Sequence, residues 1–320
     1  MQSLNPLLEW AYRRWLPAAR VEPLGHDLGV VPGAAAWQHW LERGLLVAGV
    51  LLLACGLVFF VAANWSGMGK MARFALVQGV LLGGVLAYIW RGDDLAGRSA
   101  LAFCVLAIGA LFALYGQTYQ TGADPWQLFA AWALCALPLV WLAQAAPLWL
   151  FWLLLVDLAL LRWLMLHGEL WLGLHDSAWP LWVLFVVHGA ALATMELRGT
   201  GSPRWPRQLL YLVTLAPLAA IAFFGILGVT DEGALALLVW SLFAAGSFWW
   251  YRKRQLEIVA LSALVLSAVV LMTTAIGRAF NDFDNPLVWL LLAALSIGLT
   301  TVAGGWLLRQ VRAEAARVVP

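Results

Sequence analysis

The sequence predicts an all-α integral membrane protein with about ten transmembrane helices, and three observations support this fold class. First, 63% of the 320 residues are hydrophobic and only 11% are charged, whereas soluble domains average roughly 25% charged residues. Second, apolar stretches recur along the chain, each long enough to cross about 30 Å of hydrocarbon as a helix. Third, these stretches are continuous, whereas membrane β-strands show short alternating patterns.

Ten stretches have the length of a membrane span. The first covers residues 44–64, GLLVAGVLLLACGLVFFVAAN. The other nine cover approximately residues 73–90, 99–116, 126–143, 147–166, 178–197, 209–229, 234–251, 258–277 and 286–308. No apolar run precedes the first span, so we expect that span to be retained and not cleaved as part of a signal peptide.

The N-terminal segment differs from the rest of the chain because it carries charges and prolines. Its stretch LLEWAYRRWL, residues 7–16, groups apolar side chains near one face, which is typical of an amphipathic helix. We expect a break from Pro17 to Pro32, followed by a second helix from Gly33 to Arg43 that runs into the first span.

These features divide the chain into three parts. Residues 1–43 are expected to be a cytosolic helical segment, residues 44–308 a transmembrane helical bundle, and residues 309–320 a cytosolic tail. The N-terminal segment either docks on the bundle or binds a protein partner or the membrane surface.

Lysine and arginine residues predict the orientation, because basic residues concentrate in cytoplasmic loops. With a cytoplasmic N-terminus, most of the 19 basic residues lie on the inner side: Arg13, Arg14, Arg20, Arg43, Arg91, Arg98, Arg198, Arg204, Arg207, Arg252, Lys253, Arg254, Arg309, Arg312 and Arg317. The outer side holds only Lys70, Arg73, Arg162 and Arg278. The sequence therefore predicts an even number of spans with both termini inside.

The charge and the cysteines exclude several classes of function. The formal net charge is only +2, so no basic surface of the kind that binds nucleic acid is expected. The cysteines Cys55, Cys104 and Cys135 lie in apolar runs without metal-binding or redox spacing. We predict no metal and no cofactor, and the sequence favours a protein that is not an enzyme. Its expected partners are the lipid bilayer and another membrane or periplasmic protein.

Tryptophan and glycine are abundant in the apolar stretches. Nine of the 21 tryptophans lie near predicted span ends, as in the aromatic belts of membrane proteins. Four lie deeper and are predicted to pack between helices: Trp132, Trp152, Trp182 and Trp240. Five glycines are predicted to mark close contacts between helices: Gly79, Gly83, Gly84, Gly304 and Gly305.

Two segments carry a resemblance to a known family. They are FFVAANW at residues 59–65 and YGQTYQTGADPWQLF at residues 115–129. In these segments, and over about residues 5–145, the sequence resembles the predicted bacterial membrane proteins of domain-of-unknown-function family 2157. The resemblance implies a multi-pass protein of the bacterial inner (cytoplasmic) membrane and adds no reaction.

The loop from Gly116 to Trp126 is the first candidate binding site. It is rich in amide and hydroxyl groups and has no basic residue: Gln117, Thr118, Tyr119, Gln120, Thr121 and Asp124. Such groups can bind a sugar or a lipid headgroup through neutral hydrogen bonds. Alternatively, Asp124 and Pro125 begin the next helix as its N-cap and first residue. We expect the Gln117 to Thr121 string to fold back against the adjoining spans.

The second candidate is the pair of Asp157 in the fifth span and His188 in the sixth. Each residue lies about 15 Å from the inner end of its predicted span at 1.5 Å per residue. An ionisable group at the membrane midplane costs roughly 2.5 to 3.5 kcal/mol, so we expect both side chains to face the bundle and to interact. The pair is either a proton relay or a structural hydrogen bond between two helices.

A third group follows the fifth span. It contains His167, Glu169, His175 and Asp176, whose side chains are suitable ligands for divalent metals. The spacing matches no standard metal motif, so no metal site is predicted there.

The function that the sequence favours is a transporter or lipid-handling carrier with a midplane polar site. Ionisable residues inside the spans and the small extramembrane mass support this hypothesis. The alternative is a non-catalytic membrane scaffold or a regulatory subunit of a membrane complex, which the N-terminal helices favour. A water-filled cavity that reaches Asp157 would distinguish a transporter from a scaffold.

Overall fold

The computed structural model describes residues 17–27, 33–120, 122–172, 178–197, 204–254, 256–280 and 286–318. Within these ranges it contains eleven α-helices and no strand, which confirms the predicted all-α class. The chain forms two compact units, residues 1–156 and residues 157–320. The boundary between them falls inside a helix.

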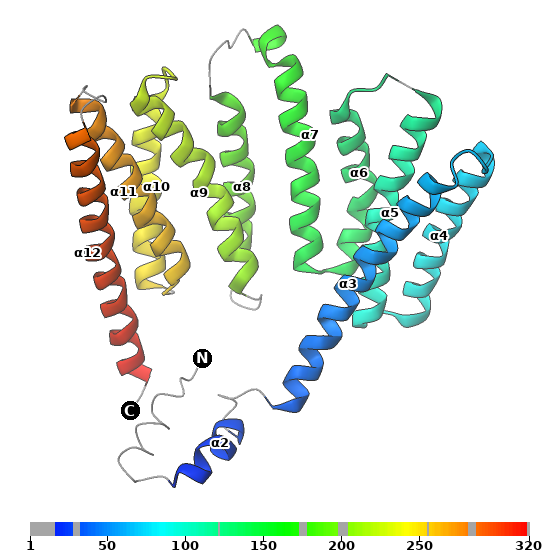
Figure 1. Ribbon diagram of the computed structural model, residues 1–320, viewed down its shortest axis with the longest axis horizontal. Helices are drawn as coiled ribbons and strands as arrows, with labels where there is room; N and C mark the ends of the chain where they lie inside the picture. Colours follow the sequence, from blue (N-terminus) through cyan, green and yellow to red (C-terminus); the bar gives the residue numbers. More distant parts are fainter. Residues whose placement is uncertain are drawn as a thin grey trace. The chain divides into compact units, whose positions relative to one another are not determined.

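The helices follow one another with short connections (Figure 1). Unit 1 contains α2 (Ala18–Asp27), α3 (Ala34–Ala63), α4 (Lys70–Arg91), α5 (Leu95–Tyr119), α6 (Pro125–Ala143) and the first part of α7 (Ala146–Leu172). Unit 2 contains the rest of α7 and α8 (Trp179–Leu197), α9 (Arg204–Leu227), α10 (Gly233–Lys253), α11 (Ile258–Phe280) and α12 (Pro286–Val318).

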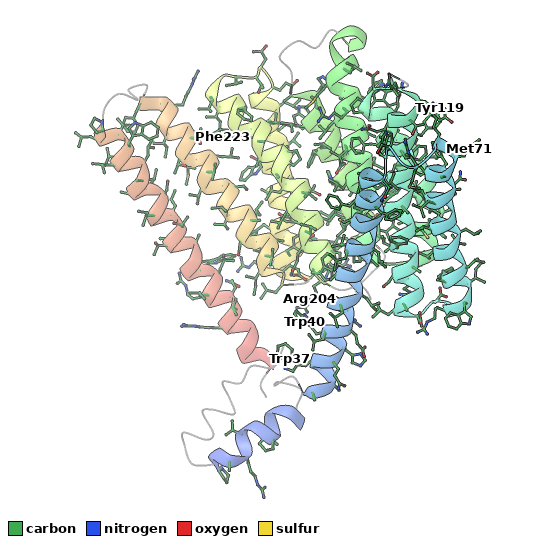
Figure 2. All side chains as sticks on the ribbon, turned by 45° about the vertical axis from the view of Figure 1, so that its right-hand side comes forward. Trp37, Trp40, Met71, Tyr119, Arg204 and Phe223 are labelled. Carbon is green, nitrogen blue, oxygen red and sulfur yellow. The ribbon has the colours of Figure 1, made fainter. Side chains whose placement is uncertain are left out.

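Ten of the described helices, α3 to α12, are long and apolar enough to cross a membrane. Each of the ten predicted stretches falls on one of them. Many of their apolar side chains are exposed, for example Leu52 and Phe59 in α3, which are 72% and 74% exposed. Figure 2 shows such side chains projecting outward along the helices. Surfaces of this composition contact lipid, because the exposure of so much apolar area to water is energetically unfavourable.

The N-terminal region differs from the expectation in one respect. Residues 7–16, where the amphipathic helix is predicted, lie outside the described residues. The expected break from Pro17 to Pro32 is wrong in part, because α2 forms between the two prolines and contains Pro23. Pro17 precedes the first turn, where a missing amide is tolerated, and Pro23 removes only one hydrogen bond farther along. The second helix is continuous with the first span, as expected, and together they form α3.

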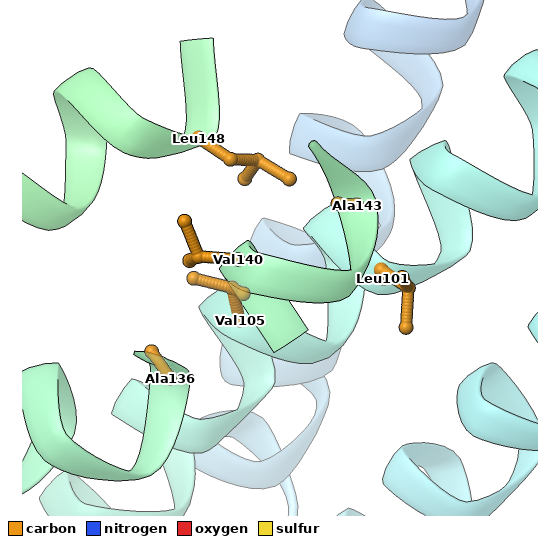
Figure 3. Close-up of a cluster of buried hydrophobic side chains, with 6 residues drawn as sticks. All are labelled: Leu101, Val105, Ala136, Val140, Ala143 and Leu148. Atoms are coloured by element: carbon orange, nitrogen blue, oxygen red, sulfur yellow. The ribbon is translucent and has the colours of Figure 1, made fainter. Parts of the chain in front are cut away.

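The core of unit 1 joins α5, α6 and the start of α7. Its buried side chains are Leu101, Val105, Ala136, Val140, Ala143 and Leu148 (Figure 3). Two of the deep tryptophans form hydrogen bonds between these helices. The indole of Trp132 donates to the carbonyl of Val105 at 2.7 Å, and that of Trp152 donates to the carbonyl of Ala133 at 2.9 Å.

The core of unit 2 is built around α9, which packs against α8, α10 and α11. Buried residues recur along it at helical spacing: Leu210, Leu215, Leu218, Ile221 and Ala222. Where α9 turns into α10 the two helices nearly touch. A β-carbon added to Gly225 would lie 2.1 Å from the α-carbon of Gly233, so only glycine fits.

The prediction of close-packing glycines is correct at one position and wrong at four. A β-carbon on Gly84 would lie 2.4 Å from the sulfur of Cys104 in α5. In contrast, nothing lies within 4 Å of the corresponding position at Gly79, Gly83, Gly304 or Gly305. Glycine content does not reveal which face of a helix meets a neighbour.

Candidate functional site

Asp157 and His188 are in direct contact in the middle of two predicted spans. Asp157 is the twelfth residue of the apolar window Ala146–Leu166, and His188 is the tenth residue of the 19-residue helix α8. The His188 Nε2 atom lies 3.0 Å from Asp157 Oδ2, and the two side chains are 7% and 15% exposed. The expected side-by-side arrangement of the two residues is therefore present inside unit 2.

The second ring nitrogen defines where the protons of this pair can lie. His188 Nδ1 is 2.8 Å from the carbonyl oxygen of Leu184, one turn earlier in α8. A carbonyl only accepts hydrogen bonds, so Nδ1 must carry a proton. One further proton then occupies the bond between Nε2 and Oδ2, on either the imidazole or the carboxyl group. In both forms the pair is neutral overall, which suits its burial.

One oxygen of this pair has no hydrogen-bond partner. Among the described residues, Asp157 Oδ1 is buried and accepts no hydrogen bond. A buried acceptor without a partner costs roughly 1 to 3 kcal/mol. Asp157 therefore retains an acceptor position that a water molecule, a substrate group or a rearranged side chain could use.

The surroundings of His188 are tightly packed and largely apolar. Phe185, one turn earlier, contacts Phe243 of α10 with ring centroids 5.8 Å apart. On the other side, α8 lies against α9, where a β-carbon on Gly189 would be 3.8 Å from the methyl group of Thr214. Thr214 is fully buried, and its hydroxyl donates to the carbonyl of Leu210.

A second buried polar cluster, which the sequence analysis missed, lies where four helices of unit 2 end or begin. Arg207 near the start of α9 is 3.2 Å from Glu257, which precedes α11, and 3.8 Å from Glu196 near the end of α8. These three side chains are 10%, 6% and 11% exposed, respectively. Gln208 donates a further hydrogen bond to Glu257 at 3.0 Å.

Aromatic donors from α10 complete this cluster. The hydroxyl of Tyr251 and the indole of Trp250 donate to the two oxygens of Glu196, at 2.9 and 3.2 Å. The sequence feature that could have indicated this cluster is the presence of Glu196 and Glu257 at span ends where most charged residues are arginines. Spacing could not predict the pairs, because Glu196 and Arg207 belong to different helices and the other contacts join residues about 50 positions apart.

The polar string after the third span is placed differently from the expectation. The sequence predicts a loop from Gly116 to Trp126, but α5 continues through Tyr119, so Gln117, Thr118 and Tyr119 form its last turn. Gln120 ends the helix in a left-handed conformation with φ of 46°. Thr121 lies outside the described residues. Tyr119 of this turn packs on Phe74 of α4, with ring centroids 6.0 Å apart, and this contact stabilises the additional turn.

The side chains of this string diverge. Gln117 points to a cavity of about 430 Å³ between α3, α4 and α5, which is also lined by Trp65. Thr118 is partly buried, and its hydroxyl has no hydrogen-bond partner among the described residues. Tyr119 instead packs on Tyr115, with ring centroids 4.9 Å apart, and lies beneath the Lys70 ammonium group. Figure 2 shows Tyr119 at the same end of unit 1 as Met71.

Helix α6 begins at Pro125, as expected, but the expected capping hydrogen bond to Asp124 is absent. Asp124 occupies the N-cap position of α6 and Pro125 the first turn, yet the Asp124 carboxylate makes no capping hydrogen bond. The position is therefore explained by backbone conformation and proline, and the carboxylate remains available for other contacts.

Trp65 and its neighbour Arg73 close the same end of unit 1. The Arg73 guanidinium lies over the Trp65 ring, 3.7 Å from its centre, and donates to the Trp65 carbonyl. Arg73 is only 9% exposed, and its Nε atom has no partner among the described residues. This contact fixes the turn between α3 and α4 beside the cavity.

Metal binding has no geometric support in the described part of the chain, where no three His, Cys, Asp or Glu residues cluster. His167 and Glu169 lie within α7, and His175 and Asp176 lie outside the described residues. Asp157 and His188 line neither the cavity of unit 1 nor a groove of unit 2 between α10, α11 and α12.

Comparison with known proteins agrees with the resemblance noted from the sequence. Residues 8–149 match a family model described as predicted membrane protein (DUF2157), which confirms that resemblance. No curated protein and no solved structure matches the chain. The matched region includes both segments that meet at the cavity of unit 1, through Trp65 and Gln117.

Proposed function

We propose that this protein is a carrier of the bacterial inner membrane, for a small solute or a lipid, in which Asp157 and His188 bind and release a proton during transport. The observation that carries the proposal is the contact of 3.0 Å between His188 Nε2 and Asp157 Oδ2 within two candidate membrane spans. In the proposed orientation both termini are cytoplasmic, and the pair lies near the membrane midplane.

The chemistry of the pair supports proton exchange. With one shared proton the pair is neutral, and loss of that proton leaves one negative charge in a buried site. That charge is costly in the membrane, so release requires water or a cation to reach the pair. The unpartnered Asp157 Oδ1 is the acceptor to which such a group would bind. Proton release is thereby coupled to a conformation that opens the site.

The packing around the pair supports the same mechanism. Both residues are largely buried here, so the described conformation is one in which the pair is closed to solvent. A carrier must alternate between closed and open conformations, and its ligand shifts their populations by binding one more tightly. Protonation would stabilise the closed conformation because it removes the buried charge.

The test is charge movement in reconstituted membranes. Proteoliposomes adsorbed on a solid-supported electrode are exposed to a rapid pH change, and the wild-type protein should give a transient current as protons enter the membrane site. Asp157→Asn should abolish this current while preserving the fold. Glu232→Gln, at the start of α10 outside the spans, is the charge-matched control and should retain it. An unchanged current in Asp157→Asn would show that the pair is only structural.

One observation favours a second function, that of a membrane scaffold or regulatory subunit. Every residue from Ala34 to Leu45 at the start of α3 is exposed, including Trp37 and Trp40, which are 55% and 65% exposed. Exposed tryptophans at a helix surface are frequent anchors in protein interfaces. Replacing both tryptophans with alanine should disrupt co-purification of a membrane-protein partner if this function is correct.

A further inference from the structure

A groove of about 450 Å³ lies on unit 2, between α10, α11 and α12. Its walls are apolar along most of their length, with Val265 and Met272 from α11 and Leu299 and Val302 from α12. These residues recur every three, four or seven positions, so each helix presents one face to the groove. The lining of the groove therefore suits a hydrocarbon chain.

One end of the groove is aromatic and positively charged. Phe248 of α10 and Trp306 of α12 stack there with ring centroids 5.7 Å apart. The Arg252 guanidinium lies 5.6 and 5.8 Å from the centres of these two rings, and Arg309 lines the groove one turn beyond Trp306. Among the described residues, neither arginine forms an ion pair with a carboxylate. The two positive charges are thus available to an external anion.

We propose that this groove binds one anionic phospholipid, with an acyl chain along α11 and α12 and the phosphate held by Arg252 and Arg309. Guanidinium groups bind phosphate through paired hydrogen bonds, and the aromatic pair positions Arg252 for this role. Basic pockets between membrane helices on the cytoplasmic side bind lipid headgroups in the same way.

The dimensions of the groove agree with a lipid in a single leaflet. From Leu299 to Arg309, α12 advances by ten residues, or about 15 Å. This length is half of the roughly 30 Å hydrocarbon thickness of a bilayer. The arginines lie at the end of unit 2 that also carries Arg204 and Lys253, which the basic-residue count assigns to the cytoplasm. The lipid would therefore belong to the cytoplasmic leaflet.

An anionic phospholipid fits the groove better than other ligands because it has both a negative charge and acyl chains. A zwitterionic lipid has the same chains but carries a choline group that the two arginines repel. Inorganic phosphate and glycerol phosphate have the charge but no chain to fill the apolar walls. A second copy of the protein would bring helix side chains in place of a mobile chain. The proposal does not depend on proton coupling at Asp157.

The experiment is native mass spectrometry of the full-length protein in detergent, titrated with phosphatidylglycerol or with phosphatidylcholine of the same chains. The wild-type protein should bind phosphatidylglycerol more tightly. Each single substitution, Arg252→Gln or Arg309→Gln, should weaken this binding roughly five-fold, and the double variant about thirty-fold. Phosphatidylcholine binding should not change. Replacement of both arginines with lysine keeps the charge and should retain the preference for the anionic lipid.

Two control substitutions separate the groove from the rest of the surface. Arg254→Gln removes a charge at the same end of α10, where Arg254 lies over Trp250 and not over the groove, and should leave lipid binding unchanged. Ala268→Trp fills the groove and should weaken binding of both lipids, whereas Leu266→Trp, on an exposed part of α11, should not.

Several results would overturn the proposal. The first is a double arginine variant, folded by thermal unfolding, that keeps its preference for phosphatidylglycerol. The second is competition by glycerol phosphate as effective as that by the intact lipid, which would indicate a simple anion site. The third is a dimer whose formation excludes the lipid and is blocked by Ala268→Trp, which would assign the groove to a second copy.

Discussion

Arg207 and Glu257, 50 residues apart in the chain, form an ion pair in which the two side chains are only 10% and 6% exposed. The same arginine lies 3.8 Å from Glu196, so it balances two carboxylates that belong to other helices. This arrangement joins the ends of α8, α9 and α11 and makes Arg207 the central residue of the cluster.

Arg207→Ala should therefore be strongly destabilising, because it removes the one buried cation that the described residues place beside the largely buried carboxylates of Glu196 and Glu257. The expected loss is about 3 to 5 kcal/mol in free energy of unfolding, measured as a lower thermal unfolding midpoint in detergent. Arg204→Ala is the matched control. Arg204 is 77% exposed, and its guanidinium lies 3.9 Å from Glu257. Arg204→Ala should therefore lower the free energy of unfolding only slightly. Equal losses in the two variants would contradict the central role of Arg207.

The Asp157 and His188 pair predicts different effects for its two residues. Asp157→Asn should keep the fold, because the side-chain NH2 of asparagine can donate a hydrogen bond to Nε2 of the neutral imidazole, whose proton lies on Nδ1. His188→Ala should lower stability by about 1 to 2 kcal/mol, since it leaves a buried carboxyl group without its partner. Thermal unfolding of both single variants and of the double variant gives the coupling energy.

Comparing the stability of these variants with their pH-driven currents distinguishes a proton relay from a structural hydrogen bond. A proton relay predicts that Asp157→Asn loses the pH-driven current with little loss of stability. A structural hydrogen bond predicts mild and similar losses of stability in both variants with an unchanged current. Additive effects in the double variant would show that the two residues do not interact in the membrane.

The close approach of α9 and α10 at Gly225 and Gly233 predicts that one added methyl group will lower the stability of the protein. Gly225→Ala should destabilise the protein by roughly 1 to 3 kcal/mol, because its β-carbon would overlap the Gly233 backbone. Gly246→Ala, where the structure shows open space in the same helix pair, should be neutral or slightly stabilising. Thermal unfolding midpoints measure both. A neutral Gly225→Ala variant would refute the close approach.

Asp94 predicts a local pH dependence outside the spans. Its carboxylate accepts a hydrogen bond from the Gly97 amide at 2.7 Å and pairs with Arg91, and these contacts hold the pKa of Asp94 below its ordinary value of 3.8. Its stabilising effect is therefore complete above the pKa of the unfolded chain and is lost as the pH falls through the lower pKa of the folded protein.

The measurement is the difference in thermal midpoint between the wild type and Asp94→Asn, followed from neutral pH to about pH 3. This difference should shrink as the pH falls. Asp124→Asn is the control, because Asp124 occupies the same N-cap position in α6 without a capping bond. A constant difference for Asp94→Asn across this range would argue against a charged N-cap.

The distribution of basic residues predicts the topology. Reporters fused at Arg98, Arg204 and Arg254 should be active in the cytoplasm, and reporters at Thr121, Asp176 and Asp284 should be active in the periplasm. Two or more reversals would refute the model of ten spans with both termini inside. A correct pattern would also place Arg252 and Arg309 in the cytoplasmic leaflet, where the proposed lipid binds.

The sequence predicted the spans well because a membrane helix is a local feature. Hydropathy and the rise per residue locate each span within a few positions, and they place Asp157 and His188 at similar depths. The same local information failed at the ends of helices. It predicted a loop at Gln117 to Tyr119, where α5 continues and Tyr119 packs on Phe74 of α4, and a break that α2 partly fills.

Composition and the length of the apolar stretches are enough to predict that this protein is helical, that it contacts lipid and which residues lie deep in its spans. They do not predict that Arg207 lies beside both Glu196 and Glu257, that Trp65 and Gln117 line one cavity, or which glycines contact a neighbouring helix; the folded structure is needed for these. Spacing along a helix gives the depth and the face of a residue, whereas the partner of each face depends on how separate helices pack.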